Sequence, residues 1–580
     1  MDKSKHNNDK KTSNLKHKSM YKSEHNNSTN IAKSTESTEI NGKKGTKVSK
    51  KNESLENSNG VVKNEKGTTR KQLVKYAFWY FDEKGFLKID YSHRLLEFLG
   101  HKGFRIIIGN GEDVKLIQVK DNIISEVKVI HIKRFIQDYI KSLPFKIPTE
   151  IYGTDSEEKV IKDAYRDAIL SKVIKGNQQY LNKSILEFLP EFKDDILEHT
   201  ESEMYFLYKN CFVEISAKGY KAKPYKELPK YAWQHTILDR NFEKVEASKL
   251  QGYENNREGK PNQNHYNFID FLFKISNQDQ QRFDSLMSVI GYQLHNFFGY
   301  SLKAVCFTDS KIEDGNEANG RSGKSLIGQA ISQMLNTPEN QKISVTIDGK
   351  AFDTGYNHRF DKCEENTMQI HINDLDMKSG KFDFEALYPS ITEGVEVNKK
   401  RGKFYNTKSK ILLSSNQVIL GNGESHKDRL LEFEVSEFFN SKNKVNEFYN
   451  DWFWSRLWTA KQWQFFDNIM MTCCQCFLTL GKMKKVESIN LEERKFTQST
   501  CQEFVEFVRS SIRFGEKIDK QVLKNQFEDI YTDFRSHKNK WFNMKKFMQW
   551  CRAGANLGKY KIIESRSHND FYIEFIENKK

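Results

Sequence analysis

The sequence predicts a chain of several domains arranged around one α/β domain. Three observations predict that domain: an apolar strand pattern at 303–308, a Gly-Lys-Ser sequence at 323–325, and apolar residues at helical spacing from 326 to 335. The chain has 580 residues, which is enough for about three or four domains with a large combined core.

The N-terminal part divides into a tail and a small module. Residues 1–69 are rich in Lys, Asn, Ser, Thr and Glu and bury too little apolar surface to fold, so we expect a disordered basic tail. Residues 70–146 predict an α+β module. Strand patterns at 104–108 and 114–119 flank a Gly-Asn-Gly turn, which predicts a hairpin, and 127–143 predicts a helix.

Residues 147–302 are expected to form a mostly helical domain. Apolar residues recur at helical spacing at 181–197 and again at 281–298. The second of these stretches leads directly into the strand pattern of the α/β domain.

The segment Ala318–Ser325 is typical of a loop that binds phosphate groups, whose general pattern is G-x-x-x-x-G-K-[ST]. Lys324 would reach the β- and γ-phosphates of ATP, and the Ser325 hydroxyl would bind Mg²⁺. The helix that follows presents its N-terminus to the anion. The residues expected to contact the nucleotide are Asn319, Gly320, Arg321, Ser322, Gly323, Lys324 and Ser325. Ala318 departs from the pattern, because a glycine is usual there.

Two later strand patterns end in polar residues that could complete a nucleotide site. Residues 368–372 lead into Asp374, which we expect to bind Mg²⁺ and the attacking water, with Asp376 as the alternative. Residues 410–415 end in Asn416, whose side chain could sense the γ-phosphate or position water. A strand that ends in an ordinary polar turn would give the same pattern.

A basic hairpin and a single arginine complete the α/β segment, 303–439. Residues 395–404 alternate on both sides of a basic turn, which predicts a hairpin with Lys399, Lys400 and Arg401 at its tip. Arg429 follows a Gly-rich polar loop and precedes a strand pattern. Such an arginine is usually a solvated charge, but at an oligomer interface it could neutralise γ-phosphate charge on a neighbouring subunit.

The C-terminal part predicts a helical connector at 440–490 and a terminal module at 491–580. Three helix patterns and two strand patterns in the module suit a winged helix, although an ordinary helical cap would give a similar pattern. Cys473, Cys474 and Cys476 lie in an apolar helix pattern and are expected to be buried reduced thiols rather than zinc ligands.

The formal net charge of +15 favours a polyanion such as nucleic acid, although a lysine-rich surface with a solvated tail would give the same balance. Neither a run of eighteen apolar residues nor a secretory signal is visible in the sequence. We therefore expect a protein that stays in the cytoplasm of the cell that makes it and does not bind a membrane.

The order of phosphate loop, acidic strand end, basic hairpin, polar strand end and arginine resembles the superfamily 3 helicases of viruses, phages and plasmids. The resemblance covers roughly 303–437. It implies a P-loop ATPase core of the AAA+ type with ATP and Mg²⁺ as cofactors. It also implies a hexameric or similar ring in which the hairpin tip grips DNA, Asn416 acts as sensor and Arg429 acts in trans. Asn373 departs from the family, because many members have a second acidic residue there.

The upstream passages 78–104 and 290–295 resemble the primase-helicase proteins of phages and mobile elements. The module at 70–146 contains no pair of strand-borne aspartates that would suit a primase metal site. The resemblance therefore implies a separate primase or polymerase as a partner, and it implies a bacterial or phage-infected cell as the location.

Together these features lead us to expect an ATP-dependent, ring-forming DNA helicase that acts on single-stranded or forked DNA during replication of a phage, plasmid or other mobile element. One alternative is a nucleic-acid-stimulated P-loop ATPase that serves in defence or packaging. Another is a DNA-binding replication initiator without unwinding activity. Strand displacement separates the first from the second, and ATP turnover separates both from the third.

Overall fold

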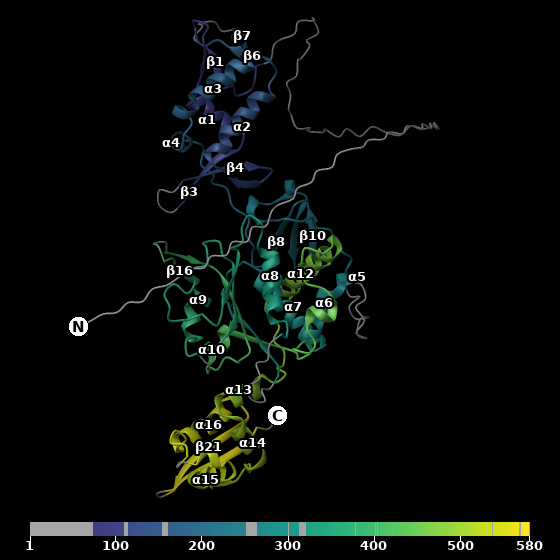
Figure 1. Ribbon diagram of the computed structural model, residues 1–580, viewed down its shortest axis with the longest axis vertical. Coiled ribbons are helices and arrows are strands. Elements are labelled where there is room, and N and C mark those ends of the chain that lie inside the picture. The colour runs from purple at the N-terminus through teal and green to yellow at the C-terminus, as the bar shows by residue number, and fades with distance from the viewer. Residues whose placement is uncertain are drawn as a thin grey trace, which may run out of the picture.

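The computed structural model describes residues 73–109, 114–152, 160–250, 264–299, 301–311, 321–377, 379–400, 402, 404–421, 423–535, 538–567 and 570–578. The tail expected at 1–69 lies outside these residues, as do Asn319, Gly320 and Arg401 of the expected site. Three bodies follow one another along the long axis of the molecule (Figure 1). Within the described residues, no helix is both long enough and apolar enough to cross a bilayer.

The N-terminal body is an α+β unit whose core contains Phe98, Phe104 and Ile136. The expected hairpin is confirmed, because β3 and β4 pair in antiparallel register with Ile106 opposite Leu116. The elements of this body are β1 (Trp79–Phe81), β2 (Leu87–Ile89), α1 (His93–His101), β3 (Phe104–Ile108), β4 (Val114–Lys120), β5 (Ile123–Glu126), α2 (Val129–Ser142), β6 (Lys146–Glu150), β7 (Ile161–Tyr165), α3 (Arg166–Tyr180) and α4 (Lys183–Leu186).

The boundary that we expected at residue 146 is wrong, because this body continues to α4. Strand β6 pairs with β7, and Ile169 and Val173 of α3 are buried in the same core as Ile136 of α2. Strand pairing across a loop depends on partners distant in sequence, which local periodicity does not reveal. The helix expected at 181–197 is only α4, four residues long.

The prediction of a mostly helical domain at 147–302 is also wrong, since strands within 203–238 form a sheet. Strands β8 (Glu203–Tyr208), β9 (Cys211–Ser216) and β10 (Gly219–Lys223) are antiparallel neighbours, and β12 (Ile237–Leu238) pairs with β8. Met204 and Phe206 enter one core, whereas Tyr205 and Leu207 enter another. A strand buried on both faces reads as a continuous apolar run and lacks the alternation that identifies a strand.

Five parallel strands form the central sheet of the middle body in the order β14-β15-β18-β13-β19. They are β13 (Ala304–Asp309), β14 (Ser344–Asp348), β15 (Gln369–Leu375), β18 (Lys410–Ser415) and β19 (Leu430–Val435). Strand β13 lies between β18 and β19 and is buried on both faces, with Val305 and Phe307 in one core and Ala304 and Cys306 in the other. The carboxyl ends of all five strands meet at one edge, and α8 (Lys324–Leu335) begins after β13.

Four helices pack on one face of this sheet: α6 (Asn267–Ile275), α7 (Gln280–Leu294), α8 and α12 (Ala460–Leu480) (Figure 1). Gly291 permits α7 and α12 to touch, because a Cβ at this position would lie 2.2 Å from the carbonyl oxygen of Cys473. Residues 440–490 contain two helices, α11 (Val445–Tyr449) and α12, and α12 is part of the core rather than a connector. Cys473 and Cys474 are buried free thiols, as expected, and Cys476 is a partly buried one.

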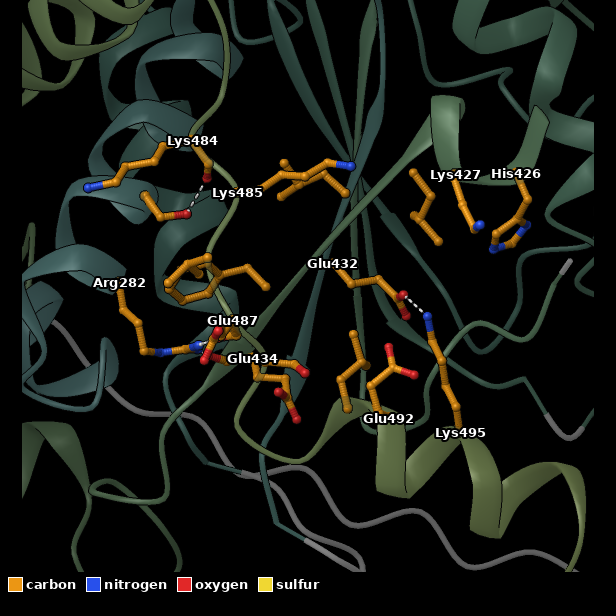
Figure 2. Close-up of a pocket in the computed structure, with 17 residues that line it drawn as sticks. Arg282, His426, Lys427, Glu432, Glu434, Lys484, Lys485, Glu487, Glu492 and Lys495 are labelled. Carbon is orange, nitrogen blue, oxygen red and sulfur yellow. Dashed lines mark hydrogen bonds and ion pairs between the residues drawn. The ribbon is translucent and has the colours of Figure 1, made fainter. Parts of the chain in front are cut away.

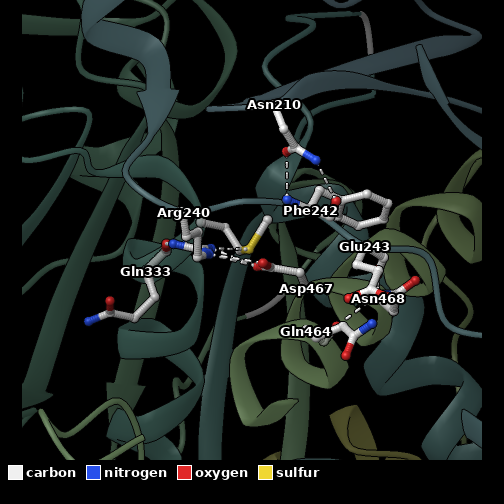
Figure 3. A network of polar contacts seen from close by, with 9 residues as sticks. Asn210, Arg240, Phe242, Glu243, Gln333, Gln464, Asp467 and Asn468 are labelled. Carbon is white, nitrogen blue, oxygen red and sulfur yellow. Dashed lines mark hydrogen bonds and ion pairs between the residues drawn. The ribbon is translucent and has the colours of Figure 1, made fainter. Parts of the chain in front are cut away.

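A buried ion pair joins the segment after β12 to the helical layer. The Arg240 guanidinium lies 2.7 Å from the Asp467 carboxylate of α12 and also donates to the Gln333 carbonyl of α8 (Figure 3). Beside it, Asn468 accepts hydrogen bonds from Tyr220 and from the backbone N–H of Val245. These contacts fix three elements that are far apart in the sequence.

The C-terminal module contains the three helices and the strand pair that the sequence predicts, with one additional helix, α13, and one additional strand, β20. Its sheet has the order β20-β22-β21, and its core includes Phe504, Phe527 and Trp550. The elements are α13 (Leu491–Ser499), α14 (Gln502–Ser510), β20 (Lys517–Asp519), α15 (Lys520–Ile530), α16 (Met544–Asn556), β21 (Tyr560–Ser567) and β22 (Asp570–Glu577).

We expect Asp467→Asn to lower the free energy of unfolding by about 3 kcal/mol, because the Arg240 charge would remain in a largely buried site without its partner. Denaturant unfolding of the purified variant measures this. The control is Asp284→Asn, which removes an exposed ion pair with Lys484 and should cost about 0–1 kcal/mol. Equal losses in the two variants would contradict a structural role for the buried pair.

Candidate functional site

At Arg321 and Gly323, in the described end of the Gly-Lys-Ser loop, the backbone has a positive φ, which glycine adopts readily and other residues adopt only with strain. Gly323 has φ of +94°, and a Cβ there would lie 2.6 Å from the ring of Phe271. Arg321 also has a positive φ, of 78°. Helix α8 begins at Lys324, so the free N–H groups of its first turn lie at the loop. This is the arrangement that binds anions at helix N-termini.

The Lys324 ammonium is buried among the carboxyl ends of two neighbouring strands. Its Nζ lies 2.5 Å from the carboxylate of Asp309 at the end of β13 and donates to Asn416 Oδ1, at 2.9 Å, beyond β18. It also lies 3.3 Å from Ser322 Oγ. Burial lowers the pKa of Lys324, and the Asp309 charge opposes that change. The structure thus brings Lys324 and Asn416 together, and it adds Asp309, which the sequence reading did not identify.

Ser325 contacts Asn373 at the end of β15. The Ser325 hydroxyl donates to Asn373 Oδ1 at 2.8 Å, and the Ser414 hydroxyl donates to the same oxygen at 2.8 Å. Asp374 is turned differently, because its φ is +60° and β15 changes register at this point. The Asp374 carboxylate lies 2.9 Å from Lys350 Nζ. The hydrogen-bond partner of Ser325 is therefore the amide of Asn373, and a role of Asp374 toward Mg²⁺ stays a proposal.

His371 fixes the distance between α8 and β15. A Cβ on Gly328 would lie 2.1 Å from His371 Nδ1, so only glycine fits there. His371 Nε2 is 3.2 Å from the Ser414 hydroxyl, which also contacts Asn373. Burial lowers the pKa of His371 to about 4, so the imidazole is neutral at pH 7. Packing and hydrogen bonds together therefore hold Asn373 against the start of α8.

The basic hairpin is present as β16 (Val395–Asn398) and β17 (Phe404–Thr407). Lys399 is drawn back into the protein, where its Nζ lies 3.0 Å from the Glu364 carboxylate and donates to the Asp361 carbonyl. Lys400 is largely exposed and lies 3.9 Å from Asp361. Phe404 is 67% exposed at the start of β17. Of the two tip lysines described, Lys400 is thus the one directed to solvent.

Arg429 ends a short helix, α10 (Glu424–Arg429), where the sequence suggested a loop. Leu430 pairs with Ala304 at the start of β13, whereas Asp309 pairs with Val435. At about 3.3 Å per residue, Arg429 therefore lies about 17 Å or more from the loop edge of its own sheet. Its guanidinium lies over the ring of Tyr388, 4.9 Å from the ring centre. The structure does not bring Arg429 to Lys324 of the same chain.

A groove of about 270 Å³ runs along the outer side of β19 (Figure 2). Charges of both signs line it, and most are paired: Glu432 with Lys495, and the Glu434 carboxylate with the backbone N–H groups of Ile489 and Asn490. Arg282 donates to the Glu434 carbonyl. These contacts attach the chain at 484–495 to the sheet, and the loop at Lys324 does not border the groove.

Comparison with solved structures gives weak likenesses. No protein-family model and no curated protein matches the chain. Two structures of the apo A form of the NrS-1 C-terminal region have 10% sequence identity and cover 83% of this chain and 99% and 98% of their own, with TM-scores of 0.35 and 0.34. The ORC2 protein of Aeropyrum pernix in ADPNP–ADP complexes has 10% identity over 51% of this chain and 90% of its own, with a TM-score of 0.21. Likenesses of this size establish neither a family nor an activity.

If Asp374 binds Mg²⁺ and the attacking water, as the sequence predicts, Asp374→Asn should retain nucleotide binding and lower ATP turnover by about 10²- to 10⁴-fold, because the metal and the water would lose their carboxylate partner. Asp376→Asn should stay active. Steady-state phosphate release and binding of a fluorescent ATP analogue measure the two quantities. Lys350→Ala is the control, because it removes the ion-pair partner of Asp374 and leaves the carboxylate. An inactive Asp376→Asn beside an active Asp374→Asn would show that Asp376 has the role.

Proposed function

We propose that this chain is an ATP-driven DNA helicase of the superfamily 3 type that works as a ring. One observation carries the proposal: the loop lysine, Lys324, and the polar side chain of Asn416 meet 2.9 Å apart at the carboxyl edge of a parallel sheet, where a helix begins. In open α/β sheets, ligands bind at the carboxyl edge, beside the strand at which the order of strands across the sheet reverses. Here that strand is β13.

The residues at this edge suit the triphosphate of ATP. The N–H groups at the start of α8 would donate to phosphate oxygens, and the Lys324 ammonium would exchange part of its contact with Asp309 for phosphate. The Asn416 side chain would then accept hydrogen bonds from groups near the γ-phosphate or orient these groups, because its amide oxygen already accepts a hydrogen bond from Lys324 Nζ. In this proposal binding and charge neutralisation come from the loop, and Asn416 supplies the orientation.

The donor set also fits Mg²⁺, which prefers oxygen ligands and usually keeps several waters. The Ser325 hydroxyl and the Asn373 amide oxygen lie 2.8 Å apart, and the Asp374 carboxylate follows directly in the chain. Mg²⁺ bound there with ATP would neutralise charge on the β- and γ-phosphates. We propose Ser325 and Asp374 as the residues that hold it, with Asn373 orienting the serine; Asp374 would exchange its contact with Lys350 for the ion.

DNA binding is proposed for the tip of the β16–β17 hairpin. Lys400 supplies an exposed charge, and Phe404 exposes a ring that could stack on a base beside it. Lys399, in contrast, stabilises the base of the tip through Glu364. Arg401 is part of the proposal from the sequence and lies outside the described residues.

An ATPase and unwinding assay tests the function. The wild-type protein should hydrolyse ATP and separate forked DNA only when ATP is present, and Lys324→Ala should lose about 10²- to 10³-fold in turnover, because it removes the main cation facing the transferred phosphate. Lys342→Ala, an exposed lysine of the same domain, is the control. Turnover stimulated by DNA without strand separation would favour the ATPase alternative, and DNA binding without turnover would favour the initiator.

The hairpin can be tested in the same preparation. Lys400→Ala should lower the slope of log affinity against log salt by about 0.7 to 0.9, the change expected for one lost phosphate contact. Lys399→Ala should change the slope less, because Lys399 is bound to Glu364. Equal slopes for wild type and Lys400→Ala would remove this lysine from the DNA interface.

A mixing experiment tests whether Arg429 acts on a neighbouring subunit. Arg429→Ala and Lys324→Ala should each be inactive alone, and a mixture should regain ATPase activity, because some interfaces then combine an intact loop with an intact arginine. An arginine acting in trans can contribute about 10³- to 10⁵-fold in rate. Native mass spectrometry would establish that the two variants assemble together. Mixed assemblies without recovered activity would contradict action in trans.

A further inference from the structure

Helix α13 lies between the middle body and the C-terminal module and is bonded to both (Figure 1). On the side of the middle body, the Gln498 side chain exchanges two hydrogen bonds with the backbone of Val418, and Lys495 pairs with Glu432 (Figure 2). On the other side, Phe496 is buried in the core of the C-terminal module. A displacement of this short helix would therefore change contacts in both bodies.

Arg494 of the same helix reaches the carboxyl edge of the central sheet. Its side chain is buried, with 7% exposed. One arm of the guanidinium donates to the carbonyl oxygen of Asp309 and the other to the carbonyl oxygen of Asn416, at 2.6 Å. A planar guanidinium has donors in a fixed fork, so a single side chain sets the spacing of these two carbonyls.

Asp309 and Asn416 are also the residues whose side chains hold the Lys324 ammonium. The same two residues thus meet Lys324 through their side chains and Arg494 through their backbones. Any change in the position of Lys324, Asp309 or Asn416 that accompanies phosphate binding would act directly on Arg494. Sequence patterns could not predict this contact, because Arg494 lies 170 residues after Lys324 in a polar stretch.

We propose that Arg494 is a positioning residue that couples the nucleotide site to the C-terminal module through α13. The inference rests on the proposed binding of ATP at Lys324. Arg494 does not touch the phosphates in this proposal; it holds Asp309 and Asn416 in place for Lys324. In return, α13 transmits the occupancy of the site to the core around Phe496.

The test compares wild type with Arg494→Lys and Arg494→Ala in the full chain. Arg494→Lys keeps the charge, but one ammonium cannot reproduce the fork that holds two carbonyls. We expect both variants to bind a fluorescent ATP analogue nearly as well as wild type. Their kcat should fall by about 10- to 100-fold with little change in KM, the range expected when a hydrogen bond to a charged group is lost.

Hydrogen exchange supplies a readout that a merely structural role would not move. In wild type, a non-hydrolysable ATP analogue should slow amide exchange in residues 544–577, and both Arg494 variants should lose this response. Arg509→Ala is the matched control, because it removes an exposed ion pair between Glu493 of α13 and Arg509 of α14 and leaves the sheet contacts. Its response should equal that of wild type.

The possible outcomes distinguish a failure of the proposed coupling from a failure of the proposed function on which it rests. A wild-type protein that binds no nucleotide would overturn the proposed function, and the coupling with it. A wild-type protein that binds and hydrolyses ATP, with Arg494 variants of equal kcat and an equal exchange response, would overturn the coupling alone. If thermal unfolding shows that Arg494→Ala is unfolded, Arg494→Lys decides the question by the same criteria.

Discussion

The burial of one ammonium group sets the arrangement of the middle body. A lysine charge removed from water needs an opposite charge or several oxygen partners, and Lys324 obtains both from Asp309 and Asn416. These partners come from β13 and from the end of β18, so the two strands must end side by side. The parallel register of the sheet, the position of α8 and the contact from Arg494 are all consistent with this one requirement.

The sequence was sufficient where chemistry is carried by neighbouring residues. The strand before Lys324, the helix that begins there and the two hairpin strands at 395–398 and 404–407 are all present, because each depends on local spacing. Asn416 was identified as a strand end, and it lies beside Lys324 because parallel strands end at one edge. Asp309 also ends a strand, so the same reasoning could have identified it.

Contacts set by distant segments could not be predicted. Asn373, rather than Asp374, meets Ser325 because β15 changes register and Asp374 adopts a positive φ, features that the residue types alone do not determine. The sheet at 203–238 was missed because burial on both faces removes the alternation of a strand. Arg494 was missed because nothing in a polar stretch of sequence identifies a buried guanidinium.

The helical layer has a further consequence for how the chain folds as it is made. Helices α6 and α7 precede the sheet in the sequence, whereas α12, which packs on α7 at Gly291, ends at Leu480. Until the residues up to Leu480 have been synthesised, α12 cannot pack, and the helical face of the central sheet lacks one of its covering helices. The nascent middle body must therefore keep apolar surface exposed until α12 emerges, which is the interval in which chaperone binding would matter most.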